Sequence, residues 1–129
     1  MSKRQLPLPT DAELDLLRVL WDRGPATVRQ VFETLNATRE VGYTTVLKLL
    51  QIMAEKGLVE RDESQRSHVY RAAAPAERTQ KQLVSDLMDR AFAGSTEQLV
   101  LQALASKRAS KEELDQIRKL LDQLEGGER

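Results

Sequence analysis

Apolar residues recur at intervals of three and four positions in the first half of the chain, the spacing of amphipathic helices. Thr10 and Glu13 form a capping box that predicts a helix start, and Gly24-Pro25 ends that helix. A second capping motif at residues 27–30 starts a shorter helix, and a third helix is predicted from Tyr43 to Lys56. The faces expected to turn inward carry Leu14, Leu17, Val19, Leu20 and Trp21, then Val28, Val31, Phe32 and Leu35, then Val46, Leu49, Leu50 and Met53.

Two short β-type runs follow the third helix. They cover residues 58–61 and 68–72, and the polar residues 62–67 between them have the character of a hairpin loop. Three helices followed by a hairpin is the order of a winged helix-turn-helix domain. The predicted fold class is therefore mainly α with a small β-hairpin wing.

The second half of the chain is predicted to be helical throughout. Ala73-Ala74-Pro75 marks a boundary, and helices are expected at about 76–93, 96–105 and 111–124. Helices of this length are marginal in water unless their apolar stripes are covered. The stripes can pack on one another within the monomer, but we favour a second subunit. We therefore divide the chain into a winged-helix DNA-binding domain (1–74) and a C-terminal helical dimerisation arm (75–129), whose predicted contact residues are Leu83, Leu87, Phe92, Leu114, Ile117 and Leu121.

The third helix carries the strongest candidate for a binding site. In a winged helix this element enters the major groove of DNA, and its outward side chains contact bases and phosphates. Threonine and glutamine can hydrogen-bond base edges, and no carboxylate occurs from residue 41 to 54, although 31% of the chain is charged. A plain solvated surface is the competing interpretation, and Leu47 is either a peripheral core residue or an apolar base contact. The predicted DNA-binding residues are Arg39, Tyr43, Thr44, Thr45, Lys48 and Gln51, with Arg66 and His68 in the wing.

The charge of the chain changes this picture. Net charge is zero, with 11 basic against 10 acidic residues in 1–74, whereas nucleic-acid-binding domains are usually basic. If the protein binds DNA, its positive charge must be concentrated locally. Each subunit then makes few phosphate contacts, so the affinity for DNA depends on binding two half-sites. A winged-helix protein–protein module that does not bind DNA is the alternative function.

Composition excludes several other classes of protein. The chain has no cysteine and one histidine, which leaves no disulfide framework, thiolate metal site or histidine-rich metal centre, and we expect no cofactor. His68 is expected to be a wing side chain rather than a ligand or general base. No paired acid and base, nucleophile triad or glycine-rich phosphate loop is present, so we do not expect an enzyme. Residues 1–7 resemble no signal peptide, and no stretch approaches a membrane helix, which predicts a cytoplasmic protein without membrane insertion.

Several motifs resemble a known family of repressors. They are the runs at 8–14, 20–21 and 24–31, then Tyr43-Thr44-Thr45-Val46-Leu47-Lys48-Leu49-Leu50, then Glu55-Lys56-Gly57-Leu58-Val59. These residues are similar to the penicillinase and methicillin-resistance repressors (BlaI/MecI/CopY), closely over 8–74 and more loosely to Leu124. The resemblance implies a homodimeric repressor on a palindromic operator with TACA/TGTA half-sites. By position, Thr44, Thr45 and Lys48 would face that operator, with Arg66 and His68 in the wing.

The chain departs from both ways in which this family releases DNA. In the β-lactam branch a membrane sensor protease cleaves an Asn-Phe bond in the arm, where this chain has Gln102-Ala103. In the copper branch a C-terminal cysteine cluster senses the metal, and this chain has no cysteine. Cleavage near Gln102-Ala103 would need a sensor protease of different specificity.

Overall fold

The computed structural model describes residues 7–106 and 108–127. Residues 1–6, which make up most of the N-terminal segment that was expected not to be a signal peptide, lie outside this range. The chain forms two compact units, one up to Val84 and one from Ser85 onward. The first holds α1 (Asp11–Arg23), β1 (Ala26–Thr27), α2 (Val28–Asn36), α3 (Tyr43–Lys56), β2 (Val59–Asp62) and β3 (Val69–Ala72), and the remaining helices are α4 (Ala76–Ala91), α5 (Thr96–Ser106) and α6 (Lys111–Gly126).

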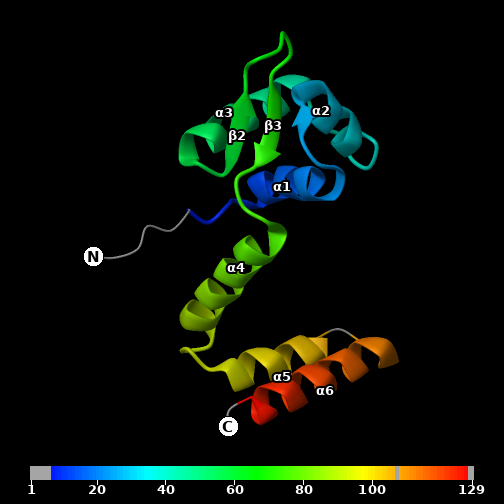
Figure 1. Cartoon of the computed structure of the whole chain (residues 1–129), viewed down its shortest axis with the longest axis vertical. Coiled ribbons are helices and arrows are strands. Elements are labelled where there is room, and N and C mark those ends of the chain that lie inside the picture. The colour runs from blue at the N-terminus through cyan, green and yellow to red at the C-terminus, as the bar shows by residue number, and fades with distance from the viewer. Residues whose placement is uncertain (1–6, 107, 128–129) are drawn as a thin grey trace, which may run out of the picture. The chain divides into compact units, whose positions relative to one another are not determined.

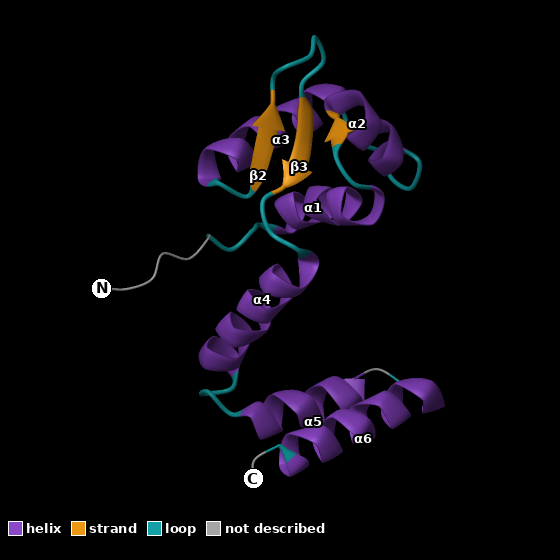
Figure 2. Ribbon diagram, in the orientation of Figure 1, coloured by secondary structure: helices purple, strands orange, loops and turns teal. Residues whose placement is uncertain are grey.

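The first unit is a winged helix, as predicted. Its strands form one antiparallel sheet in the order β1-β3-β2, and the loop between β2 and β3 extends beyond the sheet as the wing (Figures 1 and 2). In the hairpin, Val59 lies opposite Ala72 and Asp62 opposite Val69. The strand β1 was not predicted, because two residues are too few to show an alternating pattern. Thr27 belongs to β1 and is also the N-cap of α2.

The core of this unit lies between the three helices and the sheet. Val31, Val46, Leu50 and Met53 have no exposed surface, and the Tyr70 side chain from β3 is almost fully buried beside them. Leu16 is also buried, although the sequence pattern did not place it in the core. Leu47 is half-buried and packs against the core cluster, as expected for a peripheral core residue.

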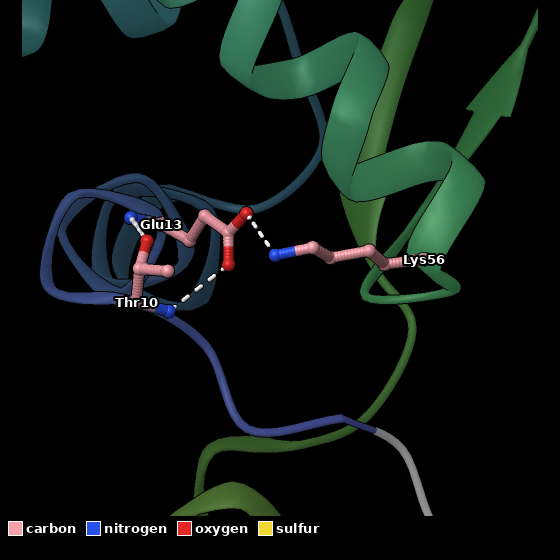
Figure 3. Close-up of polar contacts among 3 residues, drawn as sticks. All are labelled: Thr10, Glu13 and Lys56. Atoms are coloured by element: carbon pink, nitrogen blue, oxygen red, sulfur yellow. Dashed lines mark hydrogen bonds and ion pairs between the residues drawn. The ribbon is translucent and has the colours of Figure 1, made fainter.

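A partly buried ion pair joins the start of α1 to the end of α3 (Figure 3). Glu13 completes the predicted capping box by accepting from the Thr10 amide, and its second carboxylate oxygen lies 2.7 Å from Lys56 Nζ. The Glu13 side chain is only 3% exposed. Burial acts to raise the pKa of Glu13, but the hydrogen bonds from Lys56 and Thr10 outweigh it, and the pKa lies below its ordinary value. Glu13 is therefore charged and paired at neutral pH.

The first turns of α4 belong to the winged-helix unit. The Trp21 indole Nε1 donates to the backbone carbonyl of Ala74 at 2.9 Å, and Thr79 on α4 is buried. The compact unit therefore extends to Val84, past the boundary expected near residue 74. Trp21 supplies the long-range contact because its indole N–H needs an acceptor when the ring is packed against the core.

The second unit buries little of its apolar surface. Gly94, at φ 81°, turns the chain out of α4, and α5 and α6 form a helical hairpin whose residues Ala103, Leu104 and Ile117 line one hollow. Among its described residues no side chain of α5 or α6 is buried. No helix within residues 7–106 and 108–127 is long and apolar enough to span a membrane.

Candidate nucleic-acid interface

One face of α3 is anchored in the core and the opposite face is free. Val46, Leu50 and Met53 hold the helix, and the five predicted contact residues of α3 all lie exposed in this unit: Tyr43, Thr44, Thr45, Lys48 and Gln51. Thr44, Lys48 and Gln51 follow one another at four- and three-residue spacing, so they line one side of the helix. The structure therefore brings together the hydroxyl, amide and ammonium groups that the sequence singled out.

The N-terminus of α3 lacks the side-chain cap that α1, α2 and α6 have. Thr10, Thr27 and Ser110 each accept a hydrogen bond from the third residue of their helix, whereas Gly42 has no side chain with which to do so. The first backbone N–H groups of a helix have no partner within it, and together they carry partial positive charge. At α3 these groups stand beside Tyr43 and Thr44, at the end that a winged helix directs toward DNA.

The predicted basic residues fall into two groups. Within the part of the chain that the structure describes, Lys48 and Arg66 have no carboxylate at ion-pair distance. Arg39, in contrast, lies 2.7 Å from Asp15 on α1. A cation already paired on the surface gives up part of its attraction for a phosphate, so Lys48 and Arg66 are the stronger candidates.

Two acidic residues near the wing already have hydrogen-bond or ion-pair partners. Asp62 accepts from the Ser64 amide at 2.9 Å, and this hydrogen bond lowers the pKa of Asp62. Glu63 pairs with Arg61 at 2.7 Å. Both carboxylates therefore have partners of their own, and neither forms an ion pair with Arg66 in the described part of the chain. His68 is exposed in the same loop, and no cluster of three or more metal-ligating side chains occurs among the residues described.

The structure adds one basic residue that the sequence analysis did not assign to the interface. Arg29, in the first turn of α2, places its guanidinium carbon 5.4 Å from the centre of the Tyr43 ring. Phe32 packs against the same ring in a T-shaped arrangement, with centroids 5.8 Å apart and planes at 74°. The position of Arg29 in the sequence could have indicated this role, because the helix before the recognition helix crosses the DNA backbone in helix-turn-helix proteins.

The predicted dimerisation residues lie on α4 and α6, or in the turn between α4 and α5. Leu87 and Leu121 are exposed, whereas Leu83, Phe92, Leu114 and Ile117 are half-buried. Further exposed apolar residues accompany them on all three helices: Val84, Val100, Leu101, Leu104, Leu120 and Leu124. Gln102 and Ala103 are exposed within α5.

Known proteins are similar in sequence to nearly the whole chain. The family model of the penicillinase repressor matches residues 9–123. The chain belongs to the penicillinase repressor family. The transcriptional regulator BlaI of Mycobacterium tuberculosis is 35% identical over 118 residues, which cover 91% of this chain and 85% of that protein. The penicillinase repressor of Bacillus licheniformis is 22% identical over 120 residues, covering 93% of this chain and 94% of that protein.

Two solved structures share the fold of the first unit. The solution structure of the DNA-binding domain of the repressor BlaI aligns with a TM-score of 0.51 at 23% identity, over 57% of this chain and 90% of that one. The solution structure of monomeric Bacillus licheniformis BlaI with the blaP half-operator aligns with a TM-score of 0.50 at 23% identity, over 58% of this chain and 92% of that one. The family resemblance and the winged-helix fold predicted from sequence are thereby confirmed.

Proposed function

We propose that this chain is a homodimeric repressor that binds a palindromic operator through α3 and the β2–β3 wing. That the chain is a DNA-binding transcriptional repressor follows from its family, whose members are transcriptional regulators. The observation that carries the finer proposal is the exposed face of α3 between Tyr43 and Gln51, which carries no carboxylate and lies above a fully buried core. The relative from Bacillus licheniformis has been solved with a half-operator, which supports DNA as the ligand of this face.

The dimer is proposed from the second unit. Leu120, Leu121 and Leu124 each expose more than half of their surface on α6, at 53%, 55% and 59%. Complete burial of a leucine side chain contributes about 1.5–3 kcal/mol, and a second copy can supply roughly half of this for each of the three. Residues 75–129 are therefore proposed as the dimerisation arm. Because Lys48 and Arg66 offer few phosphate contacts per subunit, joining two half-sites supplies the affinity that one lacks.

Thr45→Ala is expected to weaken binding to a TACA/TGTA palindrome by about tenfold while changing binding to a scrambled duplex less than twofold. The reason is that base contacts carry sequence specificity, whereas phosphate contacts act on every sequence. Titration of both duplexes at moderate salt, followed by fluorescence anisotropy, measures the two affinities.

Thr34→Ala on α2 is the matched control, since Thr34 is also an exposed threonine, and its hydroxyl donates to the Gln30 carbonyl. This variant should bind both duplexes as the unaltered protein does. Equal losses on both duplexes for Thr45→Ala would show that Thr45 does not read bases. A folded, dimeric protein that binds neither duplex would instead favour a protein–protein module.

The releasing partner is proposed to be a membrane sensor protease that cuts α5 near Gln102-Ala103. Among the described residues α5 has no buried side chain, so its local unfolding breaks few packing contacts. Limited digestion with a protease of broad specificity is therefore expected to cut α5 before α1 or α3. First cuts in α1 or α3 would contradict the proposal, and cuts in the 62–68 loop serve as an internal reference for an exposed segment.

A further inference from the structure

Three residues from two helices meet beside the proposed DNA-binding face. Arg29 and Phe32 come from α2, and Tyr43 is the first residue of α3. The Arg29 guanidinium lies over the Tyr43 ring, and Phe32 forms a T-shaped pair with the same ring. Tyr43 is thus held from two sides, with 40% of the residue still exposed.

This cluster is poorly explained as a device for stability. The Arg29 side chain is 67% exposed, and a cation–π contact in water contributes little. Arg29 forms an ion pair with Glu33 of the same helix, but at 3.8 Å this pair is too long for a hydrogen bond, and Glu33 is itself 63% exposed. The pair is therefore looser than the 2.7 Å contact of Arg39 with Asp15. The fold therefore leaves the donors of Arg29 available to a ligand.

The ligand that fits these donors is a phosphate group of the DNA backbone. Guanidinium groups bind phosphate with charge-assisted, often paired hydrogen bonds, and a tyrosine hydroxyl can donate to the same group. In helix-turn-helix proteins the helix before the recognition helix crosses the backbone, so the start of α2 meets phosphates where α3 enters the groove. Arg29 and Tyr43 bring these two helix starts together.

We propose that Arg29 is a further determinant of DNA binding, which contacts a backbone phosphate and positions Tyr43 to contact the same phosphate. The inference rests on the proposed function of α3 as the DNA-binding helix. It assigns affinity, and not sequence preference, to Arg29, because the contact is to the backbone.

The test uses the full-length protein and two duplexes of equal length, one with the TACA/TGTA palindrome and one scrambled. Arg29→Met is expected to weaken binding to both duplexes about tenfold and to reduce the slope of log affinity against log salt by about one per protomer. Arg29→Lys should restore the slope but only part of the affinity, since lysine keeps the charge without the planar stack. In the Arg29→Met background, Tyr43→Phe should cost less than it does alone, since both groups serve one phosphate.

Arg23→Met is the matched control, because Arg23 is an exposed arginine at the end of α1 and outside the proposed interface. It should change affinity less than twofold, and thermal unfolding should be the same for all variants. Arg29→Met equal to Arg23→Met in affinity and slope would overturn the inference alone. Failure of the unaltered protein to bind either duplex would overturn the DNA-binding function, and the inference with it.

Discussion

Replacing Leu121 with glutamate is expected to convert the dimer into monomers and to weaken operator binding about 100-fold. Leu121 is 55% exposed in the chain as described, so the substitution removes no core contact within the monomer. At a dimer interface it would bury an unpaired charge, which costs about 3 kcal/mol, equivalent to about 100-fold. Analytical ultracentrifugation at micromolar concentration measures the assembly, and anisotropy with the palindromic duplex measures the affinity.

The control is Gln123→Glu, which adds the same charge at an exposed polar position of the same helix. We expect this variant to remain dimeric and to keep its affinity within about twofold, as is usual for surface substitutions. A dimer that survives Leu121→Glu with full operator affinity would contradict the proposed role of α6.

Replacing Lys56 with methionine is expected to lower the free energy of unfolding at pH 7 by about 2 kcal/mol. Removing one partner of a buried ion pair costs about 3–5 kcal/mol, and we take a smaller value because the Lys56 side chain is 35% exposed. Without Lys56, the buried Glu13 carboxylate keeps only the Thr10 hydrogen bond shown in Figure 3. Urea denaturation followed by circular dichroism measures the change.

The loss should depend on pH in a direction that the pKa of Glu13 determines. This pKa is lower in the folded chain than its ordinary value of 4.5, so the unfolded chain takes up the proton first as the pH falls. The stabilisation by the pair is therefore complete above about pH 4.5 and is lost as the pH falls through the lower folded value. Lys56→Met should accordingly cost most at neutral pH and progressively less at acid pH.

Lys81→Met serves as the control, since Lys81 is an exposed lysine on α4. It should change the free energy of unfolding by less than about 0.5 kcal/mol at every pH. A constant cost of Lys56→Met between pH 7 and pH 3 would show that the loss does not come from the ion pair with Glu13.

Local patterns predicted the helices closely because their signals are local. The capping boxes at Thr10, Thr27 and Ser110 are all formed, and α3 has the predicted bounds, Tyr43–Lys56. A capping box and an apolar stripe act within a few residues of one another, so the sequence displays them directly. The exposed face of α3 was predictable for the same reason, as the outward positions follow from the inward ones.

Contacts between distant segments were not predictable in this way. Glu13 meets Lys56 across 43 residues, and Trp21 meets Ala74 across 53. The two-residue strand β1 exists only because β3 lies beside it, with Ala26 opposite Tyr70. No periodicity records such pairs, because each depends on how complete helices pack against the sheet.

The sequence by itself determined the order of helices and strands, the absence of carboxylates from residues 41–54 and the family to which the chain belongs. Tertiary structure alone decided which cations are free for DNA: Arg39 is paired with Asp15, while Lys48 and Arg66 are unpaired among the described residues. It also brought Arg29 over Tyr43. The physical reason is distance along the chain. Hydrogen-bonded caps and amphipathic faces act along one helix, whereas the Arg39–Asp15 pair and the Arg29–Tyr43 contact each need two elements docked together.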